Sequence, residues 1–129
     1  MHYSLLFSLF GPFLVWPIEL LLPYPHFVEE IFKLAVVLFI INCGSSQKNG
    51  IKSALLAGVF FAMSETVLYI FKINLYGDVG LLGVRFLLTS VLHSFTFLVI
   101  YLGARKGYVT SLIATIVAIF VHWLYNSHI

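Results

Sequence analysis

The chain has 129 residues, of which 61% are hydrophobic and only 9% are charged, and its mean hydropathy is +1.05. About a quarter of the residues of a soluble domain are charged, so this composition excludes a soluble globular protein and indicates an integral membrane protein in a lipid bilayer. The net charge of +2 is too small and too scattered to indicate a nucleic-acid partner. The single cysteine, Cys43, excludes an internal disulfide.

Five apolar segments follow one another along the chain, and each is predicted to be a transmembrane helix because about 20 apolar residues cross a bilayer. The expected spans are residues 4–22, 27–43, 51–71, 82–103 and 108–125. The first segment has no basic residues before it and no cleavage site after it, so we expect a retained span. The fold class is therefore all-α, a polytopic helix bundle forming one membrane-embedded domain over residues 1–129.

The connections are short, apart from a longer loop at residues 72–80, so sequential helices should be antiparallel neighbours. Basic residues in the loops predict the orientation, and they gather at one end of the bundle: Lys48, Lys52, Arg105 and Lys106. That end is expected to be cytoplasmic in a cell-membrane protein. The N-terminus is then cytoplasmic and the C-terminus lies outside.

The second segment begins with Glu29, Glu30 and Lys33, which a helix surrounded by lipid would avoid. Glu29 and Lys33 are four residues apart and share a helix face, whereas Glu30 points elsewhere but can still approach Lys33 at a spacing of three. One carboxylate can therefore be held ionised by the lysine while the other stays available for chemistry. Capping of the helix start explains one glutamate comfortably and two poorly. Glu19, in the first segment, could join the site, but an interfacial charge is the preferred interpretation.

The third segment carries Glu65 beside a stripe of small residues, Ala54, Gly58 and Ala62, which is typical of close packing between membrane helices. Glu65 should therefore face protein rather than lipid. Two interpretations remain open for it, a catalytic carboxylate or a protonated one hydrogen-bonded to a neighbouring helix.

The fourth segment carries Arg85, Thr89 and His93 at intervals of four residues, so the three line one helix face. Arg85 could extend to the membrane interface, but His93 lies too deep for that role. On the fifth segment His122 and Asn126 are again four residues apart. An imidazole and a carboxamide together can donate hydrogen bonds to a developing oxyanion.

The depth of these groups can be compared because a helix rises about 1.5 Å per residue. Four predicted helices place ionisable groups in the outer half of the membrane: Glu29, Glu30, Glu65, His93 and His122. We therefore expect one polar site, located toward the outer half of the bilayer.

Together these residues resemble the PrsW family of glutamic-type intramembrane proteases, in the superfamily of type II CAAX prenyl proteases and bacteriocin-processing enzymes. The family pattern is EExxK, then FxxxE, then a histidine in a later helix, then HxxxN or similar in the last. The matching elements here are Glu29-Glu30-Ile31-Phe32-Lys33, Phe61 to Glu65, His93, and His122 to Asn126. Their order, spacing and helix placement agree with the pattern.

The resemblance implies an endopeptidase in which a carboxylate activates water for attack on a peptide carbonyl. Glu29 would be the general base. Glu65 or His93 would position the water and move its proton, and His122 with Asn126 would stabilise the oxyanion.

Glu30 completes the catalytic set that the resemblance implies, while Lys33 and Arg85 would set the charge and orientation of the carboxylates. No metal and no cofactor are expected. The resemblance implies that the substrate is another membrane protein, such as one like an anti-sigma factor, cleaved near its extracytoplasmic juxtamembrane region.

Three other interpretations remain open. A zinc site is one, because suitable ligand types are present on four helices: Glu29, Glu65, His93 and His122. A non-catalytic scaffold or assembly subunit would use the same polar groups to hold helices together. A proton-coupled transporter is the least favoured, because five spans do not form inverted halves.

Overall fold

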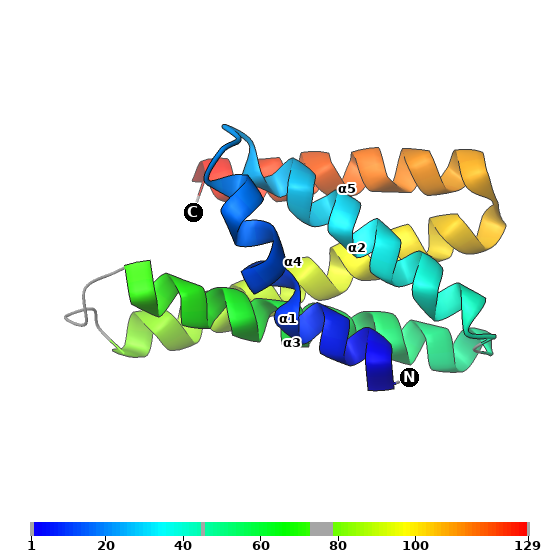
Figure 1. Cartoon of the computed structure of the whole chain (residues 1–129), viewed down its shortest axis with the longest axis horizontal. Coiled ribbons are helices and arrows are strands. Elements are labelled where there is room, and N and C mark those ends of the chain that lie inside the picture. The colour runs from blue at the N-terminus through cyan, green and yellow to red at the C-terminus, as the bar shows by residue number, and fades with distance from the viewer. Residues whose placement is uncertain (1, 45, 73–78, 129) are drawn as a thin grey trace.

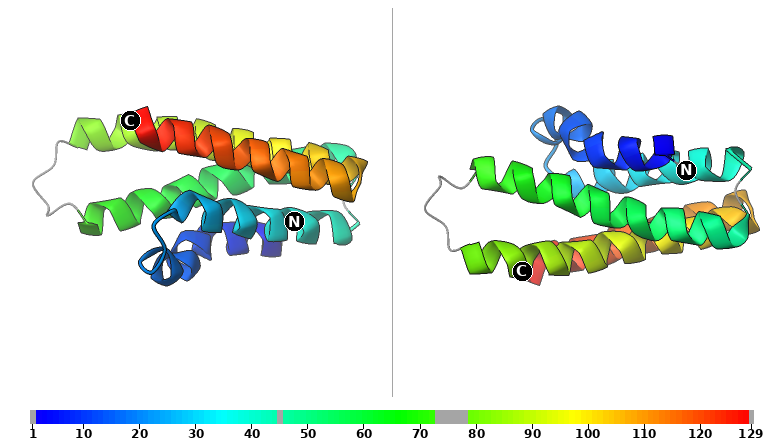
Figure 2. Two further views of the ribbon diagram at one scale, coloured as in Figure 1. Left: turned by 90° about the horizontal axis from the view of Figure 1, so that it is seen from above. Right: turned by 90° about the horizontal axis from the view of Figure 1, so that it is seen from below.

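The computed structural model describes residues 2–44, 46–72 and 79–128, and its regular structure in these ranges is entirely helical. The helices are α1 (His2–Glu19), α2 (Pro25–Asn42), α3 (Gln47–Lys72), α4 (Val79–Lys106) and α5 (Tyr108–His128). They pack into one bundle (Figures 1 and 2). The predicted all-α fold is confirmed. Most of the loop predicted at residues 72–80 lies outside the described residues.

Three of the helices are long and apolar enough to cross a membrane: Gln47–Phe71 of α3, Gly80–Lys106 of α4 and all of α5. The other two have 18 residues each, about 27 Å at the helical rise, against a hydrocarbon core of about 30 Å. In addition, α2 contains two glutamates and a lysine. The prediction that α1 and α2 also span the bilayer therefore stays a prediction.

Several helix ends differ from the expected ones. α1 ends at Glu19 rather than at residue 22, and it bends about halfway along its length (Figure 1). Pro12 and Pro17 lie inside it, and each removes a backbone N–H donor and favours a bend. At the other end of the bundle α4 continues to Lys106, so that Gly107 alone separates it from α5. Gly107 has φ of +135°, a conformation that glycine adopts without strain.

Close packing between α3 and α4 sets the position of His93. Ala54, Gly58 and Ala62 are buried, as expected of a packing stripe. A Cβ atom added at Gly58 would overlap the α4 backbone at His93 and Ser94. Small residues allow membrane helices to approach this closely. As a result, His93 is held at the centre of the bundle, where none of its surface is exposed.

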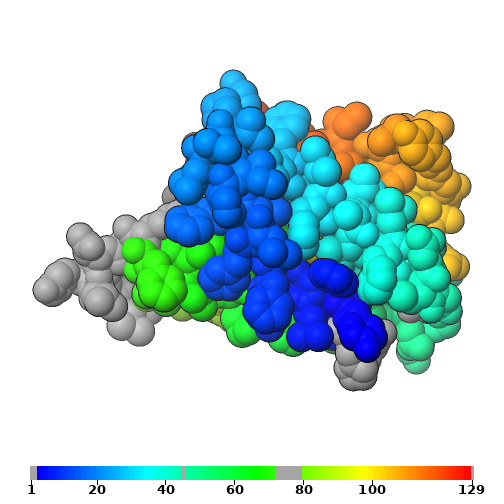
Figure 3. Space-filling view, viewed as in Figure 1, coloured from blue at the N-terminus to red at the C-terminus, as the bar shows by residue number. Residues whose placement is uncertain are grey.

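The packing of α1 fixes it across one face of the bundle, beside α2 and part of α3 (Figure 3). The Ser64 hydroxyl on α3 donates a hydrogen bond to the Leu9 carbonyl oxygen on α1. A Cβ atom at Gly11 would meet the rings of Phe32 and Phe61, so α1 comes close to both α2 and α3 at this point. The C-terminal half of α1 therefore lies near the start of α2.

Candidate functional site

The centre of the polar cluster is the ammonium group of Lys33, whose side chain is fully buried. Its Nζ atom lies 2.6 Å from Glu30 Oε1, 2.9 Å from His93 Nδ1 and 3.1 Å from Thr96 Oγ1. An ammonium group has three N–H donors and no acceptor, so these three contacts use its whole capacity. Lys33 therefore joins α2 to α4, because its charged ammonium group donates hydrogen bonds to His93 and Thr96 on α4.

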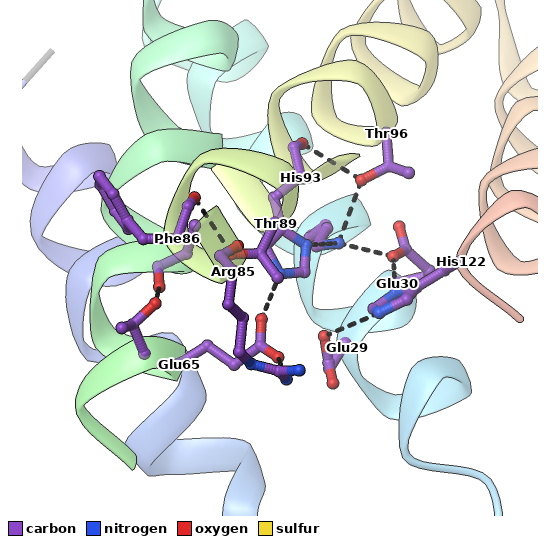
Figure 4. A network of polar contacts seen from close by, with 12 residues as sticks. Glu29, Glu30, Glu65, Arg85, Phe86, Thr89, His93, Thr96 and His122 are labelled. Carbon is purple, nitrogen blue, oxygen red and sulfur yellow. Dashed lines mark hydrogen bonds and ion pairs between the residues drawn. The ribbon is translucent and has the colours of Figure 1, made fainter. Parts of the chain in front are cut away.

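The Lys33 contact also determines the proton arrangement of His93. Because Nδ1 accepts from the ammonium, Nε2 carries the ring proton and donates it to Glu65 Oε2 at 2.5 Å (Figure 4). The second oxygen of Glu65 lies 3.4 Å from Nη2 of Arg85. Arg85 in turn lies over the Tyr69 ring, 3.9 Å from its centroid. Glu65 is thus held by one neutral and one cationic donor.

His122 connects the two adjacent glutamates of α2. Its Nδ1 atom lies 2.7 Å from Glu30 Oε1, and its Nε2 atom lies 3.8 Å from Glu29 Oε2 (Figure 4). Glu30 pairs with Lys33 and accepts the proton on Nδ1, so the Nε2 atom of the neutral ring offers a lone pair to the Glu29 side. Between them, Glu29 and His122 present two acceptors at a spacing that one water molecule can bridge.

A cavity of about 290 Å³ opens beside this cluster. Among the expected site residues, it is lined by Glu29, Glu65, Arg85 and Asn126. The remaining ones, Glu30, Lys33, His93 and His122, are at most 2% exposed and lie behind the cavity wall. The cluster therefore has an outer layer that a substrate can reach and an inner layer that supports it.

The convergence of polar groups from α2, α3, α4 and α5 agrees with the depth argument. The partner of Lys33 is Glu30, three residues away, an approach that the spacing allowed, although Glu29 was the residue expected on the same helix face. Glu30 is fully buried and does not point away from the site, so that expectation about its direction was wrong. His122 and Asn126 also separate, because His122 is buried and Asn126 is exposed on the cavity side. Their catalytic roles stay predictions.

Several residues of the site were not anticipated. Thr96 receives a hydrogen bond from Lys33, and its spacing of three from His93 was the available signal. Trp16 and Tyr125 line the cavity, although aromatic residues near helix ends are normally interfacial anchors. Glu19 also lines it, as the less favoured of its two interpretations allowed. Thr89 does not contact the side chains of the cluster through its hydroxyl, which donates hydrogen bonds to carbonyl oxygens of its own helix.

Three potential metal ligands lie close together, because atoms of Glu29, His93 and His122 fall within 4.8 Å of one another. The hydrogen bonds do not suit a metal, however. If His93 accepts from the Lys33 ammonium with Nδ1, its proton is on Nε2 and its one free lone pair is already used. Glu29 and His122 alone supply two ligands, whereas a catalytic zinc normally has three from the protein.

Buried carboxylates and imidazoles thus lie beside a cavity in a bundle that contains three helices able to cross a membrane. Residues 23–129 match a family model described as PrsW family intramembrane metalloprotease. The chain therefore belongs to the PrsW family, and the resemblance found from the motifs is confirmed. The match covers every candidate site residue from Glu29 to Asn126, whereas α1 lies before it. Searches of curated proteins and of solved structures found no match.

Proposed function

We propose that this protein hydrolyses a peptide bond of another membrane protein, with the Glu29 carboxylate as general base and without a metal. The observation that carries the proposal concerns the Oε2 atom of Glu29, a residue of the cavity wall. This atom is buried and has no hydrogen-bond partner among the described residues. A carboxylate oxygen in this position is available to a water molecule that enters with the substrate.

The charges around the cluster support Glu29 over the other two glutamates as the base. Glu30 is paired with Lys33, and Glu65 with Arg85. Glu29 is the one carboxylate of these three with no lysine or arginine among its described contacts. Glu30 is also absent from the cavity wall, whereas Glu29 lines it.

The proposed reaction begins with a water molecule between Glu29 Oε2 and His122 Nε2, whose 3.8 Å separation leaves both atoms as proton acceptors. The water oxygen attacks the substrate carbonyl carbon while its proton moves to Glu29. The C–N bond then breaks as Glu29 passes this proton to the leaving nitrogen. The products are a carboxylic acid and an amine, so atoms and charge balance.

The donors for the oxyanion differ from the sequence-based expectation. A neutral His122 that donates from Nδ1 to Glu30 has an acceptor at Nε2, which cannot donate to an oxyanion. We assign oxyanion stabilisation to Asn126 and Arg85, which line the cavity and carry N–H donors. Glu65 and His93 hold Arg85 in place through the contacts described above.

The proposed setting is the cell membrane, with the N-terminus cytoplasmic and the cavity toward the outer half. Two ends of the bundle differ in a way that supports this. The basic residues Lys48, Lys52, Arg105 and Lys106 lie near one end, whereas the cavity lies near the end where α1 ends and α2 begins. Basic residues favour the cytoplasmic side. The proposed substrate is a membrane protein of the anti-sigma-factor kind.

A metal-dependent protease is the second candidate, favoured by the closeness of the ligand atoms of Glu29, His93 and His122 and by the family description. The Lys33 hydrogen bond to His93 argues against it. The positive charges of Lys33 and Arg85 would also repel a bound metal dication. A bound dication needs deprotonated ligands with free lone pairs.

The test is cleavage of single-span membrane proteins by the purified chain in proteoliposomes, with and without a strong chelator. Metal content of the same preparation is measured by elemental analysis. The proposal predicts that cleavage survives chelation and that metal is far below one equivalent. Cleavage that is lost with the chelator and restored by zinc would establish the metal-dependent alternative.

A further inference from the structure

Two residues of the cavity wall each carry a buried hydrogen-bond donor that has no acceptor among the described residues. The donors are the indole N–H of Trp16 on α1 and the hydroxyl of Tyr125 on α5. Both atoms are buried, and neither has a hydrogen-bond partner among the residues that the structure describes. Nearly all buried polar atoms in proteins are hydrogen-bonded, so an unpaired donor in a cavity wall indicates a group that is supplied from elsewhere.

The chemistry of the missing partner follows from the donors. An indole N–H can only donate, so the partner must be an acceptor. The cavity wall already carries the carboxylates of Glu19, Glu29 and Glu65 beside the guanidinium of Arg85, so carboxylates outnumber the cation and a further anion would be repelled. A neutral acceptor is therefore favoured. The backbone carbonyl oxygen is the neutral acceptor that every residue of a peptide carries.

We propose that Trp16 and Tyr125 bind backbone carbonyl oxygens of the substrate and thereby select peptide segments that are not helical. The inference rests on the proposed peptidase function and defines its substrate class. Within a helix each carbonyl is already paired, and only the last four carbonyl groups are free. A membrane segment can therefore engage these donors where its helix ends or is interrupted by glycine or proline.

One of the two donors, Trp16, lies on α1, which is outside the residues that match the family model. The match begins at residue 23, while Pro12, Trp16 and Glu19 on α1 form one part of the cavity wall. The hydrogen bond between Ser64 and Leu9 holds α1 against α3. Trp16 is therefore presented to the cavity by a helix that is fixed to the rest of the bundle.

The test measures binding rather than cleavage, so it does not depend on turnover. The Glu29→Gln protein in nanodiscs is titrated with two fluorescent single-span peptides, one with a Gly-Pro break at the end of its apolar stretch and one with a continuous helix. Trp16→Phe and Tyr125→Phe, added singly, keep the rings and remove the donors. Each should weaken binding of the interrupted peptide roughly 2- to 10-fold, the value of one hydrogen bond. Binding of the continuous peptide should be weaker throughout and unchanged by either substitution.

Two aromatic residues outside the cavity wall provide matched controls. Trp123 is 45% exposed and Tyr108 is 78% exposed. Trp123→Phe and Tyr108→Phe change the same chemical groups and should leave the affinity for both peptides unchanged.

A second measurement alters the peptide. Replacing one amide of the interrupted peptide by an ester weakens its carbonyl as an acceptor. The ester should lower affinity for the Glu29→Gln protein and have no effect once both donors are removed. Equal binding by all variants, an ester effect independent of the two donors, or no binding of the interrupted peptide would each overturn the inference. Failure of the proposed function is recognised separately, as an absence of cleavage by the wild-type protein.

Discussion

Replacing Lys33 by methionine should destabilise the protein strongly while keeping the length and apolar part of the side chain. The Lys33 ammonium is fully buried and donates to Glu30, His93 and Thr96. Without it the Glu30 carboxylate, none of which is exposed, keeps a single described donor, His122. Removing one partner of a buried ion pair leaves an uncompensated charge and costs about 3–5 kcal/mol.

The assay is unfolding of the purified protein in mixed micelles, followed by circular dichroism, with the free energy of unfolding compared between variants. Lys52→Met is the matched control, because Lys52 is exposed and its loss should change the free energy by about 0.5 kcal/mol or less. Adding Glu30→Gln to Lys33→Met removes the orphaned charge and should recover part of the loss. A loss below about 1 kcal/mol for Lys33→Met, with no recovery in the double variant, would refute the buried ion pair.

Two further predictions concern packing and the second glutamate. Gly58→Ala should lower the free energy of unfolding by about 1–3 kcal/mol because its Cβ atom overlaps the α4 backbone, whereas Gly83→Ala, where nothing lies within 4 Å, should raise it by about 0.5–1 kcal/mol. The same unfolding assay checks both, and equal effects would contradict the close approach. Glu30→Gln should retain part of the cleavage activity and lose stability, because Lys33 loses its anionic partner. A stable Glu30→Gln protein without any cleavage would move the general base from Glu29 to Glu30.

Much of the fold was predictable because the bilayer restricts the choice of structures. Apolar segments of membrane length specify helices, since every backbone polar group must be satisfied internally. The convergence of Glu65, His93 and His122 followed from their depth alone. The ends of α1 were less predictable, because Pro12 and Pro17 bend and shorten the helix in a way that composition does not determine.

The direction of each side chain was harder to predict than its depth. Glu29 and Glu30 both lie on the buried side of α2, which also includes Val36, Val37 and Ile40. Rotation of a helix about its axis is set by packing against its neighbours, so helical spacing alone could not decide which glutamate meets Lys33.

The α1 side of the cavity was missed for a related reason. Trp16 and Glu19 resemble ordinary interfacial residues in the sequence, as does Tyr125 on α5. Their position around one cavity depends on the bend of α1 and on its packing beside α2, which are tertiary features.

The most direct test of the central claim is the cleavage rate of Glu29→Gln beside that of the wild-type protein. Both are reconstituted in proteoliposomes with the same single-span membrane substrate, and the free energy of unfolding of each is measured. An amide cannot accept the proton of the attacking water, so we predict a loss of at least about 100-fold, the usual contribution of a general base, in a protein that remains folded. Cleavage at the wild-type rate by Glu29→Gln would contradict the account.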